Sequence, residues 1–123
     1  MEALLAEMPP PPAELPWDER LTRLATAIRA TAGRHPAVFP LLLQRAAQTE
    51  QARGVRDIVC AALREAGLGQ EQAERAERLM STAVLGYAAG EAAGRFARHP
   101  QSVRDEDFAC LLRGIRTLVE GEA

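Results

Sequence analysis

The sequence predicts an all-α fold, an antiparallel bundle of about five helices, and three observations support this prediction. Apolar residues make up 47% of the 123 residues but aromatic residues only 4%, so Ala, Leu and Val must form most of the core. Ala and Leu lose little free energy when they enter a helix. Apolar positions also recur at the helical period along most of the chain. Alternating apolar and polar runs, which indicate strands, are absent from the sequence.

The first helix of the main domain is expected to begin near Trp17 and to end at Gly33. Residues 1–8 read as a short helix, and Pro9 to Pro12 must terminate it because proline has no N–H to donate. We therefore separate residues 1–12 from a domain at residues 13–123. The stripe of the first helix consists of Trp17, Leu21, Leu24, Ala25, Ile28 and Ala32.

The middle of the chain is expected to hold a brief helix at residues 38–43, a polar connection at residues 44–53 and a second amphipathic helix. Gly67 followed by Leu68 predicts a left-handed C-cap that ends this helix. The apolar face of the second amphipathic helix comprises Ala52, Val55, Val59, Ala62, Leu63 and Ala66.

Two longer helices are expected at the end of the chain, over residues 70–98 and from an N-cap at Asp105 onward. The helix over residues 70–98 has one apolar face in its first half and gains a second, opposite stripe from residue 85. The first face contains Ala73, Ala76, Met80, Ala83, Val84 and Tyr87, and the second contains Leu85, Ala89, Ala92, Ala93 and Phe96.

Too many apolar faces remain at this end of the chain for one copy to cover, so we expect a homodimer joined as a four-helix bundle. Gly86, Gly90 and Gly94 recur every four residues, although each interior Gly costs about 0.5–1 kcal/mol relative to Ala. Close approach of another helix explains them best, and room for a ligand or a helix bend are the alternatives. The predicted interface is Leu85, Gly86, Ala89, Gly90, Ala93, Phe96, Phe108, Leu111, Leu112, Ile115, Leu118 and Val119.

Composition argues against several classes of function. The net charge is −2 with acids and bases interleaved, so the basic face that grips nucleic acid is not expected. Cys60 and Cys110 match no metal-ligand spacing and are expected to be buried free thiols. No apolar run approaches the roughly 20 residues that span a bilayer, and a signal peptide is not apparent, so we expect a cytoplasmic protein without membrane contact. Catalytic constellations are absent, and neither an enzyme nor a metal or cofactor is expected.

Several short motifs, in their order and spacing, resemble the C-terminal domain of tetracycline-repressor (TetR) family regulators. The resemblance spans about residues 1–121. The motifs are Trp17-Asp-Glu-Arg-Leu21, His35-Pro36, Arg64-Glu-Ala-Gly-Leu68, Val84-Leu-Gly-Tyr87 followed by Glu91, and Asp105-Glu-Asp-Phe108 with Leu111-Leu-Arg-Gly114.

This resemblance implies a domain that binds a small molecule and dimerises, below an N-terminal helix-turn-helix head that releases operator DNA when the effector binds. The resemblance implies that residues 1–8 are the remnant of the helix that would link the two domains. The head itself is not in this sequence, so the chain alone is not expected to bind DNA. A headless module that pairs with full-length regulators is the alternative. The effector is expected to be hydrophobic or amphipathic. The resemblance places around it Trp17, Leu21, Ile28, Val59, Leu63, Met80, Val84, Tyr87 and Glu91.

Some of these residues also have a simpler structural interpretation. Glu91 shares the inward face with Met80 and Tyr87, and it is expected to pair with Arg95 four residues on or else to contact a polar or cationic effector. Tyr87 has a polar tip that can reach a ligand or cap the core. Trp17 is expected to anchor the packing of the core rather than to line a ligand site, and Met80 could either fill the core or line a pocket.

Overall fold

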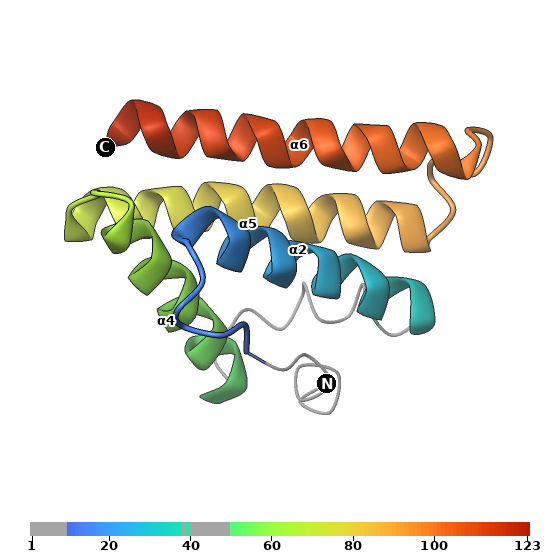
Figure 1. Ribbon diagram of the computed structural model, residues 1–123. Coiled ribbons are helices and arrows are strands. Elements are labelled where there is room, and N and C mark those ends of the chain that lie inside the picture. The colour runs from blue at the N-terminus through green and yellow to red at the C-terminus, as the bar shows by residue number, and fades with distance from the viewer. Residues whose placement is uncertain (1–9, 38, 40–49) are drawn as a thin grey trace.

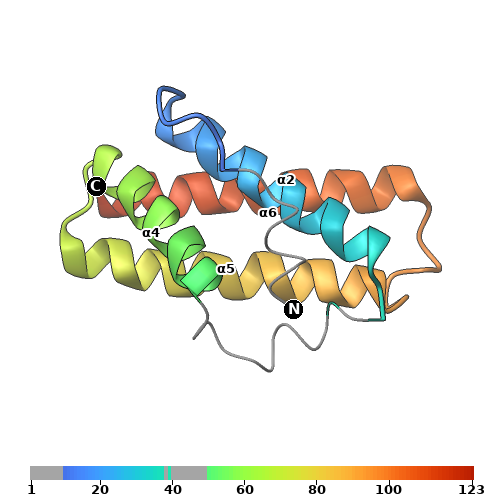
Figure 2. The ribbon, with the colours of Figure 1, turned by 90° about the horizontal axis from the view of Figure 1, so that it is seen from below.

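The computed structural model describes residues 10–37, Phe39 and residues 50–123, and all regular elements in this part of the chain are helices. The all-α prediction is confirmed. Helices α5 and α6 run antiparallel side by side, α2 crosses them obliquely, and α4 packs at an angle beside α2 (Figures 1 and 2). The helices expected at residues 1–8 and 38–43 lie outside the described residues, apart from helical Phe39. The four described helices are α2 (Trp17–Arg34), α4 (Glu50–Glu65), α5 (Gln70–Ala92) and α6 (Gln101–Glu122).

One large apolar cluster joins these four helices, and it is built from the stripes that the sequence predicts. Helix α6 is part of this cluster, because its residues Phe108, Ile115 and Val119 are all buried within this one chain. These three residues were expected at a dimer interface, and in the structure their own chain covers them. The three earlier helices do not close the core by themselves, so α6 has to cover it. The remaining buried members of the cluster are Leu21, Leu24, Ala25, Val59, Ala62, Leu63, Leu68, Ala73, Ala76, Met80 and Val84.

The end of α4 follows the predicted left-handed cap. Gly67 has a φ of +109°, a conformation that residues with a Cβ rarely adopt. Its N–H donates to the Arg64 carbonyl at 3.0 Å, and the Leu68 N–H donates to the Leu63 carbonyl at 3.2 Å. This pair of bonds is a Schellman motif, and the side chain just beyond it, Leu68, is buried in the core.

Helix α5 ends at Ala92, six residues before the predicted end at residue 98. The cause is a second left-handed cap, in which Gly94 has a φ of +84°. The Arg95 N–H donates to the Gly90 carbonyl at 2.9 Å and the Gly94 N–H to the Glu91 carbonyl at 3.0 Å. The turn brings Phe96 back over Gly90, where a Cβ would lie 3.5 Å from the ring. Gly94 therefore ends the helix, and Gly90 packs against a side chain of its own chain.

Helix boundaries differ from the prediction at two other places. Helix α6 begins at Gln101 with Pro100 as its N-cap residue, so Asp105 lies inside the helix and does not cap it. Proline at that position has the extended backbone that a cap residue needs, with a ψ of 160°. Helix α4 already begins at Glu50, so residues 50–53 of the predicted polar connection are helical.

The second apolar stripe of α5 is partly covered within the chain, and Ala93 at its end stays exposed. Ala88 and Ala89 are buried against Ala32, near the end of α2, and against Phe39. Leu85 and Ala92 pack at the edge of this smaller cluster. Ala89, which was predicted at the dimer interface, is therefore covered by its own chain.

Candidate functional site

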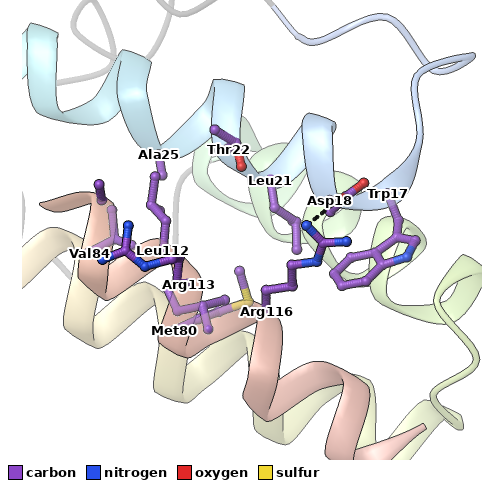
Figure 3. Close-up of a pocket in the computed structure, with 12 residues that line it drawn as sticks. Trp17, Asp18, Leu21, Thr22, Ala25, Met80, Val84, Leu112, Arg113 and Arg116 are labelled. Atoms are coloured by element: carbon purple, nitrogen blue, oxygen red, sulfur yellow. Dashed lines mark ion pairs between the residues drawn. The ribbon is translucent and has the colours of Figure 1, made fainter.

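A groove with a volume of about 250 Å³ lies between α2, α5 and α6. Its floor is apolar, since Met80 and Val84 of α5 and Leu112 and Ile115 of α6 meet Leu21 of α2 there (Figure 3). The indole of Trp17 stands at one end (Figure 3). The other lining residues are Asp18, Thr22 and Ala25 of α2 and Ala109, Arg113 and Arg116 of α6.

The charged side chains that line this groove are Asp18 on α2 and Arg113 and Arg116 on α6. Arg116 Nη1 lies 3.5 Å from Asp18 Oδ2, which ties the first turn of α2 to α6 (Figure 3). The same guanidinium donates from Nε to Glu120 at 3.2 Å, and Arg113 donates to Glu106 at 3.1 Å. Both arginine side chains are more than half exposed, so these ion pairs contribute little to stability.

Only part of the predicted ligand-binding set meets at the groove. Trp17, Leu21, Met80 and Val84 line it, and their binding role stays a prediction. Val59 and Leu63 are instead buried in the core, Ile28 is half-buried between the two apolar clusters, and Tyr87 and Glu91 belong to a charged cluster outside the groove.

The sequence prediction missed the α6 wall of the groove. Leu112 and Ile115 were assigned to a dimer interface, and no binding role was predicted for Arg113 or Arg116. The four residues lie within about one helical turn of each other, on the flank where the apolar face meets the polar one. The boundary between apolar and polar residues along this flank was the signal in the sequence that could have indicated the α6 wall of the groove.

The charged cluster joins α2, α5 and α6 beyond the groove. Arg29 of α2 grips Glu91 of α5 with two hydrogen bonds of 2.7 Å, from Nε and Nη2. Its Nη1 lies 3.0 Å from Asp105 of α6. The Arg29 guanidinium also stands 5.0 Å from the ring centre of Phe108, within cation–π range. The hydroxyl of Tyr87 donates to the Arg104 carbonyl at 2.9 Å.

These contacts shift the pKa values of the groups involved. The hydrogen bonds from Arg29 hold the pKa of Glu91 below its usual value of 4.5, against the opposing effect of burial. The same interaction raises the pKa of Arg29. Burial raises the pKa of Tyr87. Glu91 and Arg29 are therefore both charged at neutral pH, and the cluster serves to fasten three helices together.

The partner predicted for Glu91 was wrong. Its carboxylate binds Arg29 with both oxygens, and Arg104 lies 3.7 Å away, so the acid is not paired as expected with Arg95. The left-handed turn at Gly94 carries Arg95 off the helix, where its guanidinium stands 5.9 Å from the Phe96 ring centre. A direct contact between Glu91 and an effector has no support in this geometry, because both oxygens are already occupied.

The two cysteines are free, but only one is sheltered. Cys60 is half-buried, and burial raises the pKa of its thiol. Cys110 is exposed on α6, so its predicted burial is wrong. Within the described residues, no cluster of three or more His, Cys, Asp or Glu side chains can hold a metal ion. No helix in that same part of the chain is long and apolar enough to cross a bilayer.

Comparison with known families decides what kind of domain this is. Residues 21–115 match the family described as tetracyclin repressor-like, C-terminal domain. The chain belongs to this family. No match was found among curated proteins or among solved structures. The match covers most of α6 and nine of the twelve residues that line the groove, and Trp17, Asp18 and Arg116 lie just outside it.

In this tetracyclin repressor-like domain, the residues expected at a dimer interface divide by exposure. Gly86, Ala93 and Leu118 are exposed, and a Cβ added at Gly86 would meet no atom within 4 Å. Leu79 and Gly114 are exposed as well, on the same two helices as Gly86 and Leu118, which are α5 and α6. Five of the other predicted residues are half-buried, namely Leu85, Gly90, Phe96, Leu111 and Leu112. The remaining four are buried within the chain, namely Ala89, Phe108, Ile115 and Val119.

Proposed function

We propose that this chain is the effector-binding and dimerisation domain of a tetracyclin repressor-like transcriptional regulator, which releases operator DNA when a small hydrophobic molecule binds. The apolar groove between α2, α5 and α6 is the observation that supports effector binding most directly. Concave sites with an apolar lining and a few polar groups are where small molecules usually bind.

Helix α6 provides the physical link between the groove and the dimer. One flank of α6 lines the groove through Leu112 and Ile115, while Gly114 and Leu118 are exposed on another flank. An effector that parts α2 from α6 would therefore shift a helix that also contacts the second copy. Such a shift changes the separation of whatever the two copies hold.

The dimer surface we propose, called the outer face, consists of two exposed stripes of mainly small or apolar side chains. The stripes are Leu79, Thr82 and Gly86 on α5 with Cys110, Gly114 and Leu118 on α6. Added Cβ atoms at Gly86 and Gly114 would meet nothing within 4 Å, so a helix from a second copy can approach closely there. Pairing the α5–α6 layers of two copies gives a four-helix bundle.

Two measurements test this function together. Analytical ultracentrifugation at micromolar concentration should give the mass of a dimer, and a monomer would refute the dimer. A thermal-shift screen against apolar and amphipathic small molecules should raise the melting temperature, since a ligand that binds only the folded state stabilises it. A dimer that binds no ligand would instead favour a headless module that pairs with full-length regulators, which a pull-down after co-expression would detect.

A further inference from the structure

We propose that the groove selects an amphipathic anion, with an apolar chain on the floor and a carboxylate head bound by Arg113 and Arg116. This proposal rests on the function proposed above, because it names the chemical class of the effector. Three features of the groove support it: the length of its apolar floor, the two arginine residues in its lining, and the weakness of the contacts that those arginines make without a ligand.

The floor suits an extended hydrocarbon. Trp17 and Ala25 both line the groove and are eight residues apart on α2, which corresponds to about 12 Å along the helix. Over this length the floor presents aliphatic side chains and the Met80 thioether, an adaptable group that can reshape around a flexible chain. A medium-length alkyl chain can bury its surface there without leaving polar groups of the protein unsatisfied.

The head group is indicated by the two arginine residues in the lining. Arg113 and Arg116 are three residues apart on α6, so they lie on neighbouring positions of one helix face. Guanidinium groups bind carboxylates with two parallel hydrogen bonds, a geometry that favours an anionic head over a neutral one. Asp18 is the one acidic residue in the lining, so the lining has a net charge of about +1 at neutral pH.

The present partners of these arginines can be exchanged at little cost. The Arg116 and Arg113 side chains are 60% and 64% exposed, and ion pairs in such positions contribute at most about 1 kcal/mol. Asp18 also accepts a hydrogen bond of 3.0 Å from the Glu19 N–H in the first turn of α2. Its charge therefore stays stabilised by the helix N-terminus when Arg116 turns to a ligand.

The test uses three probes with the same alkyl chain: decanoate, decanol and decyltrimethylammonium. Trp17 is the single tryptophan of the chain and lies in the groove, so its fluorescence reports occupancy directly. Decanoate should bind more tightly than decanol, and decyltrimethylammonium should bind most weakly. The affinity for decanoate should fall as salt rises from low to high concentration, whereas that for decanol should not.

Substitution of both arginines separates head recognition from apolar burial. Arg113→Gln with Arg116→Gln should weaken decanoate binding about tenfold and leave decanol binding unchanged. Arg75→Gln with Arg78→Gln is the matched control, because these residues have the same spacing and are exposed on α5 outside the groove lining. The control should alter neither affinity. Circular dichroism would verify that both double variants keep their helices.

The outcomes distinguish this proposal from the more general function. If decanol or decyltrimethylammonium binds and decanoate does not, the groove is a ligand site but the anionic class is wrong. Equal loss of decanoate affinity in the two double variants would also overturn it, since general charge would then explain the binding. If none of the three probes changes Trp17 fluorescence, both this proposal and the assignment of the groove as the effector site fail.

Discussion

The substitution Glu91→Gln tests whether the charged cluster fastens α2 to the α5–α6 layer. It keeps the size and shape of the side chain but removes the charge that Arg29 binds through two hydrogen bonds of 2.7 Å. Arg29 then stays in a site where its side chain is only 17% exposed, and Glu91 itself is 15% exposed. The variant is therefore expected to be less stable than the wild type.

The size of the loss follows from this exposure. Removing one partner of a fully buried ion pair costs roughly 3–5 kcal/mol, and exposed pairs contribute at most about 1 kcal/mol. Because the pair is mostly buried and Arg29 keeps its contact with Asp105, we expect a loss of about 2 kcal/mol. The unfolding entropy of a 123-residue chain is about 0.26 kcal/mol/K, so the melting temperature should fall by about 8 °C.

Thermal and urea denaturation followed by circular dichroism would measure this change. Glu106→Gln is the matched control, because it removes the acid of the Arg113–Glu106 pair, in which both side chains are more than 60% exposed. The control should lower the melting temperature by no more than about 4 °C, as expected for an exposed pair. A Glu91→Gln variant as stable as the control would refute the argument that this cluster fastens the helices.

Three other predictions follow from the same structure. Folding lowers the pKa of Glu91, so the stability that its charge provides is present above its usual pKa of 4.5 and is lost as the pH falls toward the folded pKa. The difference in stability between wild type and Glu91→Gln, measured by denaturation, should therefore shrink below about pH 4.5. Gly67→Ala should lower the free energy of unfolding by about 1–2 kcal/mol, because Gly67 has a positive φ. Gly33→Ala should raise the free energy of unfolding by about 0.5 kcal/mol, because no neighbour lies within 4 Å of the added Cβ. Urea denaturation would measure both changes. Gly86→Leu and Leu118→Glu should each convert the dimer to a monomer in ultracentrifugation while the helices persist, and a dimer in both variants would exclude the proposed outer face.

The sequence predicted best those features that depend on local chemistry. The apolar stripe of α2 and the left-handed cap at Gly67 appear where expected, since helical period and the freedom of glycine act within a few residues. The end of α5 was missed because Gly94 was interpreted as one of three spaced glycines that let a second helix approach. The structure shows that these glycines have different surroundings: Gly86 is open to solvent, Gly90 packs against a ring, and Gly94 terminates the helix.

Features that depend on tertiary contacts were the ones that could not be predicted. Arg95 is the partner for Glu91 that spacing within a helix favours, whereas Arg29 is 62 residues away in the sequence. Likewise, the apolar face of α6 does not indicate whether its own chain or a second copy covers it. Phe108 is buried within the chain while Leu118 is exposed, although both belong to one broad apolar face.

Ion pairs hold α2 to α6 at two places of unequal strength, and this asymmetry bears on how an effector would act. At the groove, Asp18 meets only the exposed Arg116, whereas at the other end Arg29 meets Asp105 and is also held by Glu91. An effector that replaces the Asp18 contact would loosen the link between this end of α2 and α6, although the buried Arg20 still pairs with Glu65 of α4. We therefore expect α2 and α6 to part first at the groove while Arg29 holds them together beyond it. Glu91→Gln should then weaken the effect of bound ligand on the dimer more than it weakens ligand binding.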